Sequence, residues 1–312
     1  MKIYSLAFHT SYQYNLAYCF PEIDWYFVEG VWGKNRPRPK NVHLKSDLSL
    51  DRFDAILTHS PQQFREFRNK VKDFARKPEI IYISHWAYQD ILWIHLYNKR
   101  PLSQFLHDVS KHPIVCVSHY MIANFGFYSE KIVQVVPHYV PVDLFESTPW
   151  EPGGDSYANV VNQFYLPHRG VGAPFWDSLT EVPKRLYGAK NRETDAGELK
   201  TSEEFAQAMA TARGYLWTAD AVALSFAPLE AMAAGCPVIA PNNLDWPKMF
   251  RNGIDVLLYR EGDKKSCLET LEFYESSKDL QRSLSRECKN TLEERFNAAQ
   301  FRKNWDAVLS RI

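Results

Sequence analysis

Short apolar runs recur along the whole chain, and the mixed segments between them have helical spacing. In the first half, apolar runs of strand length occupy 2–8, 25–28, 54–58, 79–84 and 113–118. Residues 11–19 and 61–76 are expected to form helices between them. The second of these helices places Phe64, Phe67 and Val71 on one face. Strands that alternate with helices predict an α/β fold with a parallel, doubly wound sheet.

The second half of the chain repeats this alternation. Its expected strands are 159–163, 183–187, 215–217 and 236–240. Its expected helices are 202–212, 229–234, 268–296 and 300–312. With 312 residues, 45% of them hydrophobic, the chain is long enough for two domains that each bury a core.

The most informative stretch is 215–258, which reads as strand, loop, short helix and strand. Pro228 fits the first position of the helix, and Gly235 is a natural C-terminal stop. Glu230 is then expected in the first turn, beside unpaired N–H groups and the positive end of the helix dipole. Such a place can bind a diphosphate, with a carboxylate nearby for sugar hydroxyls. Complementing the helix dipole is the alternative role of this carboxylate.

The segment LEAMAAGCPVIAP closely resembles the signature of retaining glycosyltransferases with the GT-B fold, in particular glycosyltransferase family four. The resemblance implies two Rossmann-like, doubly wound domains facing a cleft, and Glu230 as the ligand of the donor ribose. The segment VPHYVPVDLF resembles the family's crossing between domains. We therefore predict an acceptor-side domain at 1–140, a nucleotide-sugar-binding domain at 141–296, and a C-terminal helix at 297–312 that packs back toward the first domain.

The chain departs from the family pattern just before this helix. The family usually has a Glu eight residues before Glu230, followed by Gly-Phe-Gly, whereas this chain has Val222 followed by Ala-Leu-Ser. Asp220 is the candidate replacement and a candidate catalytic residue. Ser225 and Phe226 are expected to contribute to donor phosphate binding at the helix start.

Other phosphate contacts are implied by the resemblance. Arg169, before Gly170, matches the family's phosphate-binding Lys, although a solvated loop Arg is the alternative. Ser11 and Tyr12 stand where the family has a glycine-rich loop that approaches the phosphates.

Histidines follow several expected strands of the first half, where ligands of doubly wound domains bind. His85, in IIYISHW, resembles the family's His beside the donor sugar and is the first candidate for catalysis. His9 and His59 are candidates for the acceptor side. Capping a strand or helix is the alternative role for each ring.

The segment 33–45 is expected to be a long loop with two prolines and five Lys or Arg. The prolines favour an extended arm that holds its cations outward. Arg36, Arg38 and Lys40 are therefore candidate acceptor contacts, with a merely solvated connection as the alternative. Residues 1–145 carry 17 Lys or Arg against 13 Asp or Glu, which weakly favours an anionic partner.

We predict a glycosyltransferase that moves a sugar from a UDP- or GDP-type donor to an acceptor hydroxyl. The resemblance implies retention of configuration and no metal or other cofactor. A glycan or glycolipid is the first acceptor considered, a hydroxymethylated base in phage-type DNA the second; a non-catalytic sugar-nucleotide binder is the other alternative. Five cysteines without a CxxC pair and no signal or transmembrane segment predict a cytoplasmic protein. The oligomeric state stays open.

Overall fold

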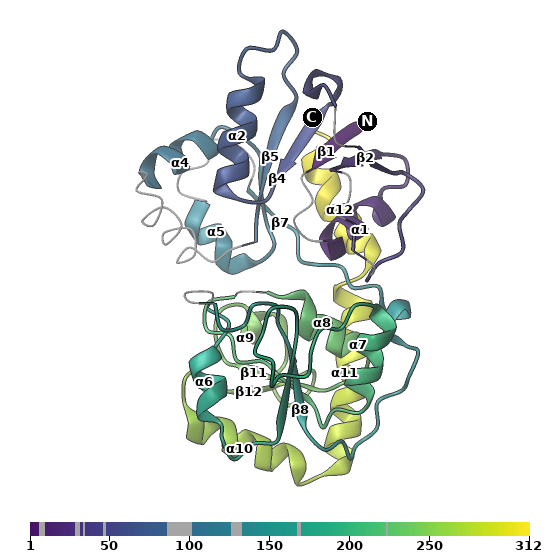
Figure 1. Ribbon diagram of the computed structural model, residues 1–312, viewed down its shortest axis with the longest axis vertical. Coiled ribbons are helices and arrows are strands. Elements are labelled where there is room, and N and C mark those ends of the chain that lie inside the picture. Colours follow the sequence, from purple (N-terminus) through teal and green to yellow (C-terminus); the bar gives the residue numbers. More distant parts are fainter. Residues whose placement is uncertain are drawn as a thin grey trace. The chain divides into compact units, whose positions relative to one another are not determined.

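The computed structural model describes residues 1–5, 10–28, 32–33, 35–45, 48–85, 102–125, 133–166, 170–222 and 224–312. The chain forms two compact units (Figure 1). The first contains Met1–Tyr139 and Ala298–Ile312, and the second contains Val140–Asn297. Each unit is an α/β structure around one parallel sheet, as predicted.

The sheet of the first unit has the strand order β3-β2-β1-β4-β5-β6-β7, with every neighbouring pair parallel. Its strands are β1 (Lys2–Ser5), β2 (Asp24–Phe27), β3 (Val42–Leu44), β4 (Ala55–Thr58), β5 (Glu79–Ser84), β6 (Ile114–Cys116) and β7 (Val133–Val135). The helices described here are α1 (Thr10–Cys19), α2 (Pro61–Val71), α4 (Leu102–Val109), α5 (His119–Phe125), α12 (Ala298–Leu309) and the 3-10 turn η1 (Leu50–Arg52).

Helix α2 shows how the sequence pattern becomes packing. Its first turn is capped by Ser60, whose hydroxyl accepts a backbone N–H, and Pro61 takes the first position. Phe64 and Phe67 are buried, and α2 packs on β4 and β5. The helix ends at Val71, where the buried face ends, rather than at 76 as expected.

Helix α12 belongs to the first unit although it ends the chain, as the resemblance implied. It lies beside α1 (Figure 1). Arg302 donates to the carbonyl oxygen of Cys19 at 2.8 Å and pairs with Glu22. Phe301 and Trp305 of the same helix are buried in the unit. The helix is thus fixed by both apolar and ionic contacts.

The sheet of the second unit has the order β12-β11-β10-β8-β9 and is also parallel. Its strands are β8 (Tyr157–Val160), β9 (Lys184–Tyr187), β10 (Tyr215–Leu216), β11 (Val238–Pro241) and β12 (Leu257–Tyr259). Its helices are α6 (Ala173–Ser178), α7 (Ser202–Ala210), α8 (Phe226–Ala233), α9 (Trp246–Met249), α10 (Lys264–Glu275), α11 (Lys278–Arg295) and the 3-10 turn η2 (Val142–Phe145).

Departures from expectation also occur at three further places. The expected loop at 33–45 contains β3, because Val42 is buried and pairs with Trp25 of β2. The helical region 268–296 is divided, because Ser277 caps a new helix and accepts the N–H of Leu280 at 3.2 Å. Strand β8 starts at Tyr157, two residues before the expected start.

All five cysteines are buried as free thiols. Burial raises the pKa of four of them to about 12: Cys19, Cys116, Cys267 and Cys288. Across the residues described, no helix is both long enough and apolar enough to cross a membrane.

The buried carboxylate of Asp255 connects the loop before β12 to helix α11. Asp255 is 0% exposed and accepts the backbone N–H of Arg251 and the hydroxyl of Thr291, each at 2.8 Å. The guanidinium of Arg251 also donates to it, at 2.5 Å. Burial raises the pKa of Asp255, but the hydrogen bonds from Arg251 and Thr291 outweigh burial and hold it below its usual value.

We expect Asp255→Asn to lower the free energy of unfolding by about 1.5–3 kcal/mol at pH 7, the usual size for hydrogen bonds to a charged group. Because the folded pKa is lowered, this stabilisation is present above the ordinary value of 3.8 and is lost as pH falls through the folded pKa. Urea unfolding at pH 7 and pH 3 measures it. An equal loss of unfolding free energy at both pH values would contradict an ionic origin of the stabilisation.

Candidate functional site

Two loops at the carboxyl ends of β8 and β10 are joined by hydrogen bonds. We call 170–172 and 218–221 the paired loops. The carbonyl oxygen of Gly170 accepts the N–H groups of Asp220 and Ala221, at 3.1 and 3.0 Å. The Thr218 hydroxyl donates to the carbonyl oxygen of Val171 at 3.2 Å. The amides of Asp220 and Ala221 are therefore engaged within the protein rather than presented to a phosphate.

Both positions in the paired loops require glycine, because the backbone has a positive φ there and the two loops approach each other closely. Gly170 has φ +63° and Gly172 has φ +79°, in the left-handed region. A Cβ on Gly172 would lie 1.8 Å from the carbonyl oxygen of Thr218. A Cβ on Gly170 would lie 2.3 Å from the Cβ of Ala221. The contact between the loops thus depends on the absence of side chains at both positions.

Helix α8 begins at Phe226, after four residues that follow the paired loops. Its N-cap is Ser225, whose side chain makes no capping hydrogen bond, and its first residue is Phe226. Pro228 is therefore the third residue rather than the first, which costs little because N–H groups of a first turn have no helical partner. Glu230 is the fifth residue, so its expected place in the first turn is wrong by one turn.

Glu230 is buried, with 9% of its surface exposed. Its charge acts on Tyr215 of β10: burial raises the pKa of Tyr215, and the nearby Glu230 carboxylate raises it further. The Tyr215 hydroxyl donates to Asn159 Oδ1 of β8 at 3.1 Å. The carboxylate is therefore close to Tyr215, in one of the middle strands of the sheet.

The other predicted donor residues are placed as follows. Asp220 is exposed on the paired loops, and Ser225 is partly exposed. Phe226 is buried, with 6% exposed, so its side chain is mainly a packing residue. Arg169 lies outside the described residues.

The loop after β8 is tied to the loop after β9. Asn162 Oδ1 accepts the N–H of Ala189 at 2.8 Å, and Asn191 Oδ1 accepts that of Phe164 at 2.8 Å. Gln163, in the loop after β8, has φ 53°. A left-handed non-glycine residue at a strand end costs energy and is typical of functional loops.

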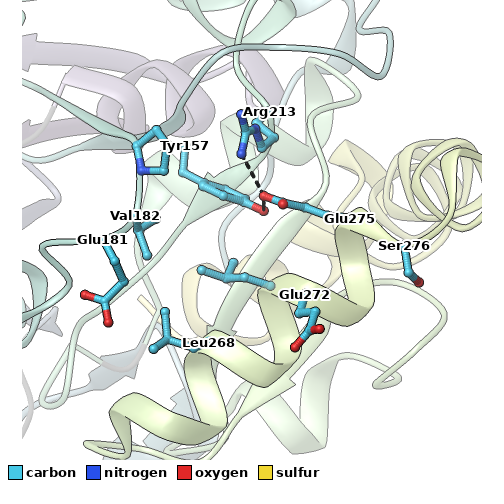
Figure 2. A pocket seen from close by; sticks show the side chains of 10 residues that line it. Tyr157, Glu181, Val182, Arg213, Leu268, Glu272, Glu275 and Ser276 are labelled. Atoms are coloured by element: carbon cyan, nitrogen blue, oxygen red, sulfur yellow. Dashed lines mark hydrogen bonds and ion pairs between the residues drawn. The ribbon is translucent and has the colours of Figure 1, made fainter.

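Figure 2 shows a recess of about 540 Å³ elsewhere in the second unit. Its residues include Tyr157, Pro183 and Arg213, at or just before the amino ends of β8, β9 and β10. Tyr157 and Arg213 both donate to Glu275 Oε1, at 2.8 Å. Ligands of parallel sheets bind at the carboxyl ends of strands, so this recess is not the candidate donor site.

In the first unit, histidines gather at the carboxyl ends of strands. Ser5 Oγ lies 2.9 Å from His59 Nε2, and His59 Nδ1 lies 3.0 Å from His85 Nε2. Ser5 ends β1, His59 follows β4 and His85 follows β5, and these three strands are neighbours in the sheet. His138, after β7, has its ring centroid 6.4 Å from that of His85. We call His59, His85 and His138 the histidine cluster.

Tyr12 fills the space beside this cluster. Its ring is edge-on to that of His85, with centroids 4.9 Å apart and planes at 88°. Tyr12 is 0% exposed and Ser11 is 2% exposed, so both side chains pack inside the unit instead of facing solvent. Burial raises the pKa of Tyr12. A direct phosphate contact by either side chain stays a prediction, and their burial does not favour it.

The remaining candidate site residues of the first unit differ in solvent exposure. His59 is 0% exposed and contacts His85, whereas His85 is partly exposed. Arg38 and Lys40 are exposed, as expected. The expectation for Arg36 is wrong: its side chain is buried, with 4% exposed, and donates to the carbonyl oxygen of Asn35 at 2.7 Å.

His9 lies outside the described residues. Among those described, no group of three or more His, Cys, Asp or Glu could hold a metal ion. Sequence reasoning missed Ser5 and His138 in this region. His138 follows a strand, β7, that was not predicted, and the same strand-end argument would otherwise have selected it.

Comparisons with known proteins agree with the two-sheet fold. Residues 171–306 match the family described as glycosyl transferase-like. Sucrose-phosphate synthase from Thermosynechococcus elongatus superimposes with a TM-score of 0.73 at 11% identity, covering 100% of this chain and 98% of that one. HepE from Anabaena, solved with UDP-glucose, gives 0.72 at 11% identity, covering 100% of both chains. No curated protein sequence matches the chain.

A third similar structure is the lipopolysaccharide outer core galactosyltransferase WaaB, with a TM-score of 0.65 at 14% identity over 100% of both chains. The chain therefore has the GT-B fold, with two Rossmann-like units that each carry a parallel sheet. The family match is confined to residues 171–306, and it describes that part of the chain as glycosyl transferase-like.

Gly172→Ala is expected to cost roughly 1–3 kcal/mol more stability than Gly197→Ala. Both glycines have positive φ, but a Cβ at Gly197 meets nothing within 4 Å, so this control isolates the contact with Thr218. Urea unfolding of both variants measures the difference. Equal losses would mean that the paired loops separate without cost.

Proposed function

We propose that the protein transfers a sugar from a nucleoside diphosphate sugar to an acceptor hydroxyl, with retention of configuration and without a metal. The observation that carries this proposal is the buried Glu230 carboxylate in α8, the helix that follows the paired loops. A buried carboxylate close to a middle strand of a parallel sheet suits the two hydroxyls of a ribose.

The start of α8 supports a diphosphate beside the ribose. Its first N–H groups have no helical acceptors, and the Ser225 side chain does not cap them. Charge that develops on the departing diphosphate would be stabilised by these groups and by the helix dipole. We propose Arg169 as the accompanying cation and Asp220, exposed on the paired loops, as a sugar contact.

Uridine is the base we propose for the donor, because HepE, a similar structure, was solved with UDP-glucose. His85 is the proposed sugar contact in the first unit, because it is the partly exposed member of a hydrogen-bonded histidine pair.

A glycan or glycolipid is the acceptor we propose. WaaB acts on the lipopolysaccharide outer core, which supports a glycolipid. DNA is less well supported, because cations of the basic helix α2 and the residues after it are paired with acids. The pairs are Lys70 with Glu66, Arg76 with Asp54 and Arg68 with Asp108. Such pairing reduces the positive field that phosphate binding requires.

Glu230→Ala is expected to weaken UDP binding about ten- to a hundredfold, the value of a charge-assisted hydrogen bond. Glu230→Gln should lose less affinity for UDP, since an amide keeps some hydrogen bonding. Titration calorimetry with UDP measures both, and turnover of a panel of UDP- and GDP-sugars tests the transfer itself. Glu275→Ala, in the recess of Figure 2, is the matched control and should bind UDP normally. An unchanged dissociation constant for Glu230→Ala would remove the ribose role.

The double substitution Arg38→Ala with Lys40→Ala is expected to raise KM for an anionic glycolipid acceptor several-fold and to leave donor hydrolysis unchanged. Both side chains are exposed, whereas the buried Arg36 is left intact to preserve the fold. Arg260→Ala with Lys265→Ala, also exposed, is the control in the second unit. With hydroxymethylated duplex DNA we expect no transfer. A salt slope of DNA binding that flattens by about 0.9 per lost contact would instead favour the DNA acceptor.

A further inference from the structure

We propose that His59 is a positioning residue that fixes the proton and the ring orientation of His85 through a buried hydrogen-bond chain that includes Ser5. The inference rests on the proposed role of His85 as a sugar contact. It assigns to His59 a task inside the protein instead of a contact with the acceptor.

The chain is continuous and shielded from water. Ser5 and His59 are both 0% exposed, and the two links measure 2.9 Å from Ser5 Oγ to His59 Nε2 and 3.0 Å from His59 Nδ1 to His85 Nε2. Only His85 is partly exposed. One end of the chain is therefore buried, and the other end reaches the surface of the first unit.

A hydrogen bond between two neutral imidazole rings contains one proton, so His59 Nδ1 and His85 Nε2 cannot both carry hydrogen. If His59 donates from Nδ1, its Nε2 accepts from Ser5, and His85 presents an N–H at Nδ1. If His85 donates from Nε2, His59 donates to Ser5, and His85 presents a bare Nδ1. In both arrangements, the nitrogen of His59 that carries the proton determines which nitrogen of His85 carries one.

The rings have little freedom to turn. The planes of His59 and His85 are inclined by 23° with centroids 5.2 Å apart, which suits a bond near the ring planes. Tyr12 stands edge-on to both rings, at 6.2 Å from His59 and 4.9 Å from His85. The ring of His138 is nearly parallel to the ring of His85, which it also contacts. In the described part of the unit, Tyr12 and His138 are the titratable rings that contact the pair.

The consequence is a defined hydrogen-bonding group at Nδ1 of His85. A histidine without such a partner exchanges between two tautomers and two ring orientations. Fixing both allows His85 to meet a sugar oxygen or a hydroxyl proton without reorganisation, which favours the transition state.

Two amide substitutions of His59 distinguish its hydrogen bond to His85 from its hydrogen bond to Ser5. The Asn amide lies close to the position of a histidine Nδ1, and the longer Gln amide lies close to that of Nε2. His59→Asn thus keeps a partner for His85 and loses Ser5, whereas His59→Gln keeps Ser5 and loses His85. The two variants carry the same amide group, differ by one methylene, and keep opposite hydrogen bonds.

The test combines two readouts on the full chain. Long-range ¹H–¹⁵N spectra of histidine-labelled protein report the proton on His85, with His85→Gln assigning its signals. We expect one protonated and one bare nitrogen in the wild type and in His59→Asn, and averaged signals in His59→Gln. With UDP-sugar donors, His59→Gln should lower kcat about tenfold at unchanged UDP affinity, the loss of about one hydrogen bond, and His59→Asn should restore most of it.

Averaged His85 signals in the wild type, or identical signals in His59→Gln, would overturn the inference. If His59→Gln does not fold, Ser5→Ala releases the far end of the chain and should shift the same signals. Absence of turnover with every donor would count against the proposed function, whereas the spectra would still decide the role of His59.

Discussion

One carbonyl oxygen, that of Gly170, accepts two backbone hydrogen bonds and thereby joins the loop after β8 to the loop after β10. The geometry that follows in the chain depends on this junction. It sets where Asp220 emerges, and α8 with its buried Glu230 begins four residues after the paired loops end. The junction forms only because Gly170 and Gly172 lack side chains where the backbones meet. The arrangement of these two loops is thus a matter of backbone contact first and of side-chain chemistry second.

The first unit obtains its reactive groups by a different route from the same topology. Because its strands are parallel, the residues that end β1, β4 and β5 meet at one edge, and Ser5, His59 and His85 become neighbours although they are far apart in sequence. Tyr12 from α1 then fills the remaining space, and α12 supports Tyr12 through Phe301, whose ring centroid lies 6.0 Å away. The last helix of the chain is therefore part of the packing around the cluster.

Local patterns predicted the alternation of strands and helices and the end of α8 before Gly235, because each follows from short-range rules. The start of α8 was misjudged, because Pro228 is tolerated throughout a first turn and does not mark the first residue. The burial of Arg36 and of His59 could not be predicted, because it depends on which distant elements cover them. Composition indicated a basic arm at 33–45, but tertiary contact removed one of its cations from the surface.

The buried thiols have a practical chemical consequence. A cysteine reacts as its thiolate, and in Cys19, Cys116, Cys267 and Cys288 burial raises the pKa to about 12, far above neutrality. Cys236, the fifth cysteine, is fully buried as well. Alkylating reagents and mild oxidants should therefore leave the folded protein unmodified. A single cysteine introduced at the surface would become a selective attachment point for a fluorophore or spin label, without removal of any native thiol.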